Sequence, residues 1–444
     1  MADVVQFYPT KSLFIHTLTK DINIRDCILD LVDNSVDSYI RNNIKSKRKI
    51  IIRFNKDEFY MFDNCGGIPL KELKAEVFRF GAESFTRRKP TIGLYGIGLK
   101  RSIFKLGKHI IFETDDGNNY SKLDINVKMW IRKPDDWTLP LSTTSGKSKL
   151  KPKQKPYTRI KIPELNEEII EAFTTKFENE LIKLMQIYYT RFLDNKIDIK
   201  VNEVNLSQSP IDITIPNDSK PASYIGKYEK LNIRIICWLE LKENIKRSKK
   251  AKVAKGWKVF MNERLVLLDN TTVQTGWTGN SSQLPKYHSI YNEFRGIVLL
   301  NSNTPSSLPI NTTKNGFDTE NKTYEYVLEK MIETSRPIIN FLTTKYDKEK
   351  REVDKNEKNI EDHLMSTRKI STKKFSIDSL NKNQEFKPPS RYISLQIPWN
   401  GMEVIKYTKP KRLIDAVKKK LKVNSNEEVG SKTFDYYLDL EEIK

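Results

Sequence analysis

The chain has 444 residues, of which 38% are hydrophobic and 30% are charged, and its formal net charge at pH 7 is +21. This length allows two or three domains with a sizeable core, and the lack of any apolar run of about 18 residues excludes a membrane-spanning architecture. The N-terminus lacks the pattern of a secretory signal and the three cysteines stand singly, so we expect a cytoplasmic protein without structural disulfides and without a membrane partner.

The N-terminal part predicts two helices and a hairpin. Residues 10–20 favour a short helix, and residues 22–40 favour a second helix with Asp21 or Asn23 as its N-cap. Residues 49–62 then alternate in the manner of two antiparallel strands joined by a tight turn.

One face of the second helix carries three acids and an amide. Positions i, i+3, i+4 and i+7 share a helix face, and here they are Asp30, Asp33, Asn34 and Asp37. Apolar residues take most of the other positions, so the helix should be buried. Its carboxylates would then repel each other unless a cation or hydrogen-bond donors lie beside them. The face is a candidate site, and a solvated acidic stripe is the alternative.

A glycine-rich turn follows the hairpin. Asp63 stands at the end of the second strand, directly before a segment that contains Gly66 and Gly67. Paired glycines permit backbone conformations closed to other residues and let a ligand approach the main chain. An ordinary turn is the alternative.

A second glycine-rich stretch, Gly93–Lys100, comes after an expected helix over residues 70–80 and opens another helix that runs to about Leu106. Bare amides at a helix N-terminus bind phosphate, so this stretch is a candidate phosphate cradle. It is not a Walker A loop, and Arg101 occupies the place of the third glycine of a dinucleotide fingerprint.

In combination, the acidic helix face, Asp63 with its glycines, and Gly93–Lys100 resemble the Bergerat-type ATP site. That site is shared by gyrase, heat-shock chaperones, histidine kinases and mismatch-repair ATPases, and the chain is most similar to the MORC branch. The resemblance implies an α+β fold in which a Bergerat-type α/β sandwich, over residues 1–193, binds ATP and Mg²⁺.

The resemblance also implies a role for each matching residue. Asn34 would ligate the metal, Asp30 would polarise the attacking water, and Asp63 would accept the adenine amino group. Residues 81–92 would form a mobile lid. The remaining ATP-binding residues would be Asp37, Gly67, Ile68, Ser84, Gly93, Leu94, Tyr95, Gly96, Ile97, Gly98, Leu99, Lys100 and Thr158.

Asp30 departs from the family pattern, which has glutamate four residues before the amide. The aspartate arm is one methylene shorter, and a general base must lie within about 2.6 to 3.2 Å of its proton or act through water. We therefore expect a working but slow ATPase, with Asp33 as the neighbour most able to replace Asp30.

The rest of the first domain is expected to complete a mixed sheet. Strands are predicted over residues 109–113 and 123–131, and residues 140–156 have the composition of a loop. Apolar residues at three- and four-residue spacing predict one long helix over residues 163–193.

Residues 194–348 predict a second αβ domain. Its strands are expected at residues 196–201, 231–241, 257–261, 264–268 and 294–301, and a helix is expected at 323–344. This order resembles the transducer domain that follows the nucleotide domain in MORC, mismatch-repair and topoisomerase relatives. In those proteins a lysine reaches the γ-phosphate, and the matching residue is Lys314, a candidate catalytic cation. An ordinary surface lysine is the alternative.

A basic run lies within residues 242–258. Its candidate nucleic-acid contacts are Lys246, Arg247, Lys249, Lys250 and Lys252. Such a run on a loop would bind phosphates in a salt-dependent way without reading bases. A solvated loop is the alternative, because the Lys-, Asn- and Ile-rich composition also follows from AT-rich coding sequence.

The C-terminal part predicts a linker and a small module. Residues 349–390 are highly charged and are expected to extend a helix and then form a linker. Residues 391–444 contain a basic amphipathic helix near 410–423 and an acidic tail, and are expected to bind a further protein subunit.

Three classes of function remain open. The first is an ATP-hydrolysing clamp that forms a homodimer when ATP binds and acts on DNA, in genome maintenance or in defence against foreign DNA. The second is a chaperone-like ATPase that acts on protein clients, and the third is an ATP sensor with little hydrolysis. A histidine kinase is disfavoured, because no histidine precedes the nucleotide domain on a dimerisation helix.

Overall fold

The computed structural model describes eleven stretches of the chain and forms two compact units, residues 1–395 and 396–444. No helix within the described residues is long and apolar enough to cross a bilayer. The described stretches are residues 10–79, 90–93, 96–144, 146–193, 195–209, 211, 213–240, 255–354, 372–389, 409–423 and 425–441.

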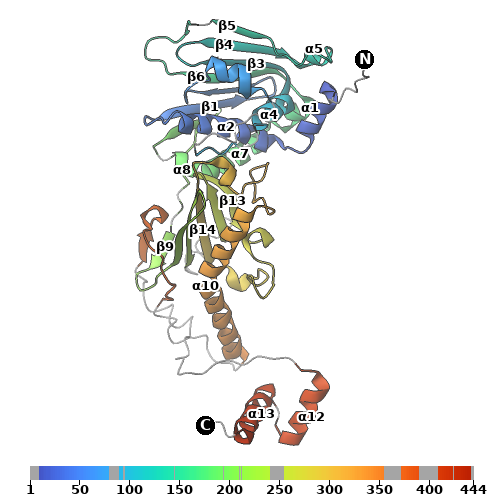
Figure 1. Cartoon of the computed structure of the whole chain (residues 1–444), viewed down its shortest axis with the longest axis vertical. Coiled ribbons are helices and arrows are strands. Elements are labelled where there is room, and N and C mark those ends of the chain that lie inside the picture. Colours follow the sequence, from blue (N-terminus) through green and yellow to red (C-terminus); the bar gives the residue numbers. More distant parts are fainter. Residues whose placement is uncertain are drawn as a thin grey trace, which may run out of the picture. The chain divides into compact units, whose positions relative to one another are not determined.

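An eight-stranded mixed sheet forms the first layer of residues 1–395 (Figure 1). Its order is β5-β4-β3-β6-β2-β1-β7-β8, and every neighbouring pair is antiparallel except β1 with β7. The strands are β1 (Arg48–Phe54), β2 (Phe59–Asp63), β3 (Gly107–Asp115), β4 (Tyr120–Asn126), β5 (Leu141–Thr144), β6 (Tyr157–Leu165), β7 (Ile197–Val201) and β8 (Val204–Asn205).

Helices cover one face of this sheet. Burial alternates along β2, as expected for a strand with one face on a core. The helices gathered beside the sheet in Figure 1 are α1 (Lys11–Lys20), α2 (Ile24–Arg41), α4 (Gly98–Leu106) and α7 (Thr175–Tyr188). Asn23 caps α2 by accepting a hydrogen bond from the backbone N–H of Asp26, 2.9 Å away. The predicted α+β class, with an α/β sandwich first, is confirmed.

Three predictions are wrong in this layer. The expected loop over residues 140–156 contains the edge strand β5. The strand expected to reach residue 131 ends at Asn126, whose side chain caps the short helix α5 (Val127–Ile131). The single helix expected over residues 163–193 is instead the end of β6 followed by α6 (Glu167–Ala172), α7 and α8 (Thr190–Leu193). Thr174 accepts from the N–H of Phe177, 3.2 Å away, and so starts a new helix where the apolar spacing continues unbroken.

The helix expected over residues 70–80 changes type. It begins as α3 (Leu70–Glu72) and continues as the π-helix η1 (Leu73–Val77). A π-turn offsets the backbone hydrogen bonds by one residue, and such turns are frequent at functional sites.

A five-stranded sheet forms the second αβ layer, with the order β10-β11-β14-β12-β13. The 33-residue helix α10 (Lys322–Asp354) packs against β10, β11 and β14, and a two-stranded ribbon of β9 and β15 packs against the opposite face. The strands are β9 (Ile213–Pro216), β10 (Ala222–Tyr228), β11 (Leu231–Leu239), β12 (Gly256–Met261), β13 (Arg264–Asn270), β14 (Phe294–Asn301) and β15 (Thr372–Phe375).

The second layer differs from the expectation in three respects. β9 and β10 are strands that the sequence analysis did not predict. The strand expected to open it, now β7, pairs with β1 and so completes the first sheet, with Ile50 opposite Ile199. β15 lies inside the expected linker and pairs with β9. A continuous cluster of buried apolar side chains extends from the first sheet to the α10 side of the second.

The unit of residues 396–444 contains the helices α12 (Lys411–Leu421) and α13 (Asn426–Leu440). α12 is the expected basic helix, and α13 occupies the expected acidic tail. Ser425 and Glu428 form a capping box at the start of α13.

Candidate functional site

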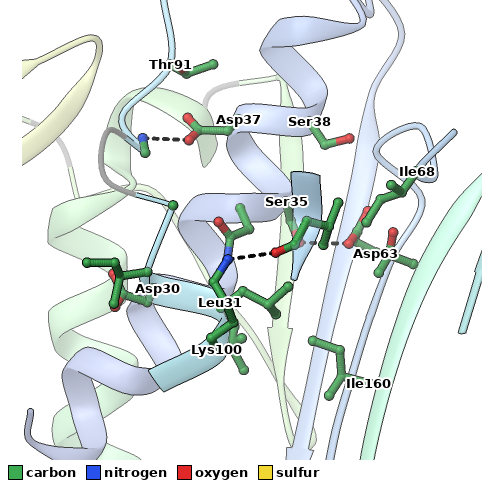
Figure 2. Close-up of a pocket in the computed structure, with 18 of the residues that line it drawn as sticks. Asp30, Leu31, Ser35, Asp37, Ser38, Asp63, Ile68, Thr91, Lys100 and Ile160 are labelled. Atoms are coloured by element: carbon green, nitrogen blue, oxygen red, sulfur yellow. Dashed lines mark hydrogen bonds between the residues drawn. The ribbon is translucent and has the colours of Figure 1, made fainter. Parts of the chain in front are cut away.

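A pocket opens in the first layer at the point where α2 faces the end of β2. It encloses about 1470 Å³ of space including its open mouth, and its walls come from α2, β2, η1, the start of α4, β6 and the loop that carries Lys314. Figure 2 shows Asp30, Leu31, Ser35 and Asp37 projecting from α2, with Asp63 across from Ser35.

Most of the predicted ATP-site residues lie around this one pocket. They are Asp30, Asn34, Asp37, Asp63, Ile68, Gly93, Gly96, Ile97, Gly98, Leu99, Lys100, Thr158 and Lys314. Ser84, Leu94 and Tyr95, as well as the five basic candidates between residues 246 and 252, lie outside the described residues. The structure thus brings together segments that are far apart in the sequence, and the individual roles stay predictions.

Asp63 is a buried acceptor at the deep end of the pocket. Its carboxylate accepts from the Ser35 hydroxyl at 2.8 Å (Figure 2) and from the Cys65 N–H at 2.9 Å. Burial raises its pKa to about 6, although both hydrogen bonds act in the opposite direction. Thr158 lies opposite Asp63 in the β2–β6 pair. A ligand that donates a hydrogen bond to Asp63 would meet a carboxylate whose charge depends on pH near neutrality.

Gly67 does not line the pocket, unlike the neighbouring Ile68. Its φ is +63°, in the left-handed region, and a Cβ at this position would collide with the backbone carbonyl of Asp115. The Ile68 N–H donates to the Thr114 hydroxyl at 2.8 Å. Gly67 therefore lets the turn after β2 pack closely against the end of β3, which is a different task from the one the resemblance implied.

Asp37 holds the glycine-rich stretch against α2. Its two carboxylate oxygens accept from the N–H groups of Ile92 and Gly93, each at 2.7 Å. A Cβ on Gly93 would lie 2.7 Å from the carboxylate, so this approach requires glycine. Burial raises the pKa of Asp37, while Lys314 and the Ile92 N–H lower it. In this structure Asp37 positions the loop.

The N-terminus of α4 opens into the pocket. Its cap, Ile97, offers no side chain to the first-turn amides, which are left for another acceptor. Gly98 brings the helix close to α2, since a Cβ there would lie 3.1 Å from the Asp30 carboxylate. An anion in the pocket would meet these amides and the positive end of the helix dipole.

Lys100 is buried and its ammonium donates to the carbonyls of Val77, at 2.8 Å, and Arg79, at 2.9 Å. Val77 is the last residue of η1 and Arg79 lies two residues after it, shortly before the segment expected to be the lid, of which residues 81–89 lie outside the described residues. Burial lowers the pKa of Lys100 to about 8. Lys100 therefore joins the first turn of α4 to the start of that segment.

The side-chain amide of Asn34 has a buried nitrogen with no hydrogen-bond partner among the described residues. No group of three His, Cys, Asp or Glu side chains in the described part of the chain could hold a metal by itself. Mg²⁺ commonly keeps several waters and takes few protein ligands besides phosphate, so a single amide oxygen at this position fits magnesium held chiefly by a nucleotide.

Asp30 is ion-paired on both carboxylate oxygens. One oxygen lies 3.1 Å from the Lys314 ammonium, and the other accepts from Arg101, 2.8 Å from Nε and 2.7 Å from Nη2. The charge of Asp30, the predicted water-polarising residue, is therefore balanced by two cations in this structure. Arg101 is a neighbour to which the sequence analysis gave no role. The sequence signal for Arg101 was its position, because it stands where a dinucleotide-binding fingerprint has its third glycine.

Asp33 lies behind the pocket and does not line it. One oxygen accepts from Arg264 Nε and from the Tyr189 hydroxyl, each at 2.7 Å, and the other lies 2.9 Å from the Lys314 ammonium. Burial would raise its pKa, but Arg264 and Lys314 outweigh burial and hold that pKa below its usual value. The expectation that Asp33 could replace Asp30 is therefore wrong, because its oxygens are enclosed.

Lys314 is 8% exposed and is not an ordinary surface lysine. Its φ is +55°, an uncommon conformation for a residue with a side chain. Burial would lower its pKa, but Asp33 and Asp30 outweigh burial and raise it, so the ammonium stays charged. A buried, charged lysine from the second layer thus reaches the acids of α2.

Comparison with protein families gives one match. Residues 22–156 match the family described as histidine kinase-, DNA gyrase B-, and HSP90-like ATPase. This region holds α2, Asp63 and the glycine-rich stretch, and it stops before Thr158 and Lys314. No curated protein matches the chain. Residues 22–156 are thus similar to ATPase domains of this type, which supports ATP binding and hydrolysis in general.

Proposed function

Because residues 22–156 match the family of histidine kinase-, DNA gyrase B- and HSP90-like ATPases, we propose that the chain is a magnesium-dependent ATPase that works as a nucleotide-gated clamp. One observation supports this most strongly. A buried acceptor, Asp63, the amide of Asn34, whose nitrogen has no partner in the described part of the chain, and the N-terminus of α4 surround a single pocket. These are the three groups needed for an adenine, a metal and a phosphate chain.

The nucleotide would lie along the pocket with its base at Asp63 and its phosphates at α4. Asp63 would accept from the adenine amino group beside Thr158, and the amides from Ile97 onward would contact phosphate oxygens. Asn34 would supply one oxygen to magnesium, which offsets phosphate charge when bound. Lys314 would leave Asp30 and contact the γ-phosphate.

Hydrolysis would depend on that exchange of partners. Asp30 can accept a proton from water only when one of its oxygens is released from its ion pairs. Lys314 is the partner that could leave, because it could pair with the γ-phosphate instead. The same ion pairs favour a second candidate, an ATP sensor with little turnover. The two candidates differ in one measurement, because only the first predicts phosphate release above the background rate.

ATP binding is the first test. Calorimetry with the full chain should find one ATP site whose affinity rises when Mg²⁺ is added, and Asn34→Ala should lose most of that rise because the amide oxygen is gone. ATP binding without magnesium should change little in the variant, which is the internal control. No heat of binding in the unaltered protein would reject the proposal.

The affinity for ATP should fall in acid. Asp63 has a pKa of about 6, so above that pH it is a charged acceptor, and below it a proton must leave before adenine is bound. The expected loss is about tenfold between pH 7 and pH 5, from one proton released per site. Asp63→Asn is the control, since it cannot titrate but keeps the titration of the ATP phosphates. Equal pH profiles for both proteins would contradict the role of Asp63.

The clamp itself predicts a change of mass. A non-hydrolysable ATP analogue with Mg²⁺ should convert monomer to dimer, because contacts at the γ-phosphate differ between the open and closed states. Light scattering would show this directly, with ADP as the matched ligand that lacks the γ-phosphate. An unchanged mass would leave the ATPase proposal standing and remove the clamp.

DNA is the proposed substrate of the clamp, on the basis of the +21 charge. Duplex DNA should raise the ATPase rate at low salt, and the effect should decline steeply as salt rises, because phosphate contacts release counterions. Stimulation by unfolded protein instead would favour the chaperone-like class.

A further inference from the structure

Arg264 is linked to Lys314 in two ways, directly through the Lys314 carbonyl and indirectly through Asp33. It is the first residue of β13 and is buried, with 2% of its surface exposed. Nε donates to the Asp33 carboxylate at 2.7 Å, and Nη1 donates to the backbone carbonyl of Lys314 at 3.0 Å. Asp33 in turn holds the Lys314 ammonium at 2.9 Å. One guanidinium therefore touches the main chain of Lys314 and the acid that binds its side chain.

The backbone of Lys314 needs such support. Its left-handed φ of +55° is strained for a lysine, and strain of this kind persists only where neighbouring groups fix the chain. The Lys314 N–H donates to the Asn311 carbonyl at 3.1 Å, which secures one side of the residue. Arg264 secures the other side through the carbonyl.

Asp33 would keep other hydrogen-bond donors if the Lys314 ammonium moved away from it. The Tyr189 hydroxyl, 2.7 Å from the same oxygen that accepts from Arg264, adds a second donor. If a phosphate draws the lysine away, Asp33 still has Arg264 and Tyr189, so the exchange leaves no buried carboxylate without partners. The arrangement allows the ammonium to move while the backbone of its loop stays fixed.

We propose that Arg264 is a positioning residue that sets where the Lys314 ammonium lies and thereby makes the pocket prefer a nucleoside triphosphate over a diphosphate. This inference rests on the proposed function, in which Lys314 contacts the γ-phosphate. ADP lacks the group that Lys314 would contact, so Arg264 should matter for ATP and not for ADP.

The fork of arginine is essential to this role. A lysine at this position keeps the charge and can reach one of the two acceptors. Its single ammonium cannot donate at once to the Asp33 carboxylate and to the Lys314 carbonyl with the geometry of an arginine. Arg264→Lys should therefore loosen Lys314 without leaving Asp33 unpaired. A purely structural role would weaken both nucleotides or neither.

The test measures the affinities for a non-hydrolysable ATP analogue and for ADP, both with Mg²⁺, in the full chain. In Arg264→Lys we expect ADP affinity within twofold of the unaltered protein and at least a tenfold loss of the preference for the triphosphate, as in Lys314→Met. Arg191→Lys is the matched control. Arg191 joins Glu263 and Asp378 by ion pairs away from the nucleotide pocket, so both affinities should stay the same.

Tyr189→Phe provides an independent readout if Arg264→Lys does not fold. It removes one donor to Asp33 and keeps the ring, so the triphosphate preference should fall in the same direction by a smaller factor. An unchanged preference in either folded variant would overturn the inference and leave the proposed function intact. Failure of the unaltered protein to bind either nucleotide would instead reject the proposed function.

Discussion

Asp30→Ala should abolish ATP turnover and leave ATP bound at least as tightly as before. A positioned general base contributes about 10²- to 10⁴-fold to a rate, and the two other carboxylates on this face of α2 are engaged elsewhere, since Asp33 is enclosed and Asp37 holds two amides. Removing Asp30 also removes a negative charge beside the phosphates. Arg101 and Lys314 would then be free to contact the nucleotide.

Single-turnover phosphate release and calorimetry separate the two effects. Asp30→Asn is the matched control, because it keeps the size of the side chain and removes only its charge, and it should be as inactive as the alanine variant. Asp30→Glu restores the arm length typical of the family and should raise turnover if the short arm limits the rate. Unchanged turnover in Asp30→Ala would reject Asp30 as the base.

Asp33→Ala should destabilise the protein by about 3–5 kcal/mol, the usual cost of removing one partner from a buried charge cluster. The change leaves the Arg264 Nε and part of the Lys314 ammonium without the Asp33 acceptor in a buried site, while the Tyr189 hydroxyl keeps the Leu29 carbonyl at 3.1 Å. Urea unfolding of the full chain would measure the difference. Asp198→Ala is the control, since Asp198 pairs with Lys47 on the surface, and it should cost at most about 1 kcal/mol.

The effect of Asp33 should depend on pH in one direction. Its pKa in the folded protein lies below the ordinary value of 3.8, so its contribution is fully present at neutral pH and is lost as the pH falls through the folded pKa. The stability difference between the unaltered protein and Asp33→Ala should therefore be constant near pH 7 and shrink only in strong acid. A difference that grew in acid would contradict the assignment of Asp33 as a charged member of the cluster.

The local part of the site could be predicted from the sequence. The face shared by Asp30, Asn34 and Asp37 follows from helix periodicity, and the strand-end Asp63 and the glycine-rich stretch before α4 follow from local patterns of strand and turn residues. Such signals lie within a few residues of each other. They indicated which chemical groups to expect, and the structure places those groups around one pocket.

The partners of Asp33 could not be found in this way. Arg264 and Tyr189 lie 231 and 156 residues away from it, and no periodicity links positions at such distances. The broken helix after β6 was missed for a different reason, since apolar spacing continues across Thr174 while its hydroxyl starts a new helix. The place of β7 depends on pairing with β1, which is a tertiary choice. Domain limits at residues 193, 348 and 390 stay predictions.

The loop that carries Lys314 leads into the long helix α10. The side chains of Phe317 and Tyr324 join that loop to the first turns of the helix, with ring centroids 5.0 Å apart. A helix of 33 residues is about 50 Å long, so a tilt of about 10° at its first turn swings its far end by about 9 Å. Any tilt of α10 about its first turn would therefore be largest at the end of the helix far from the Lys314 loop.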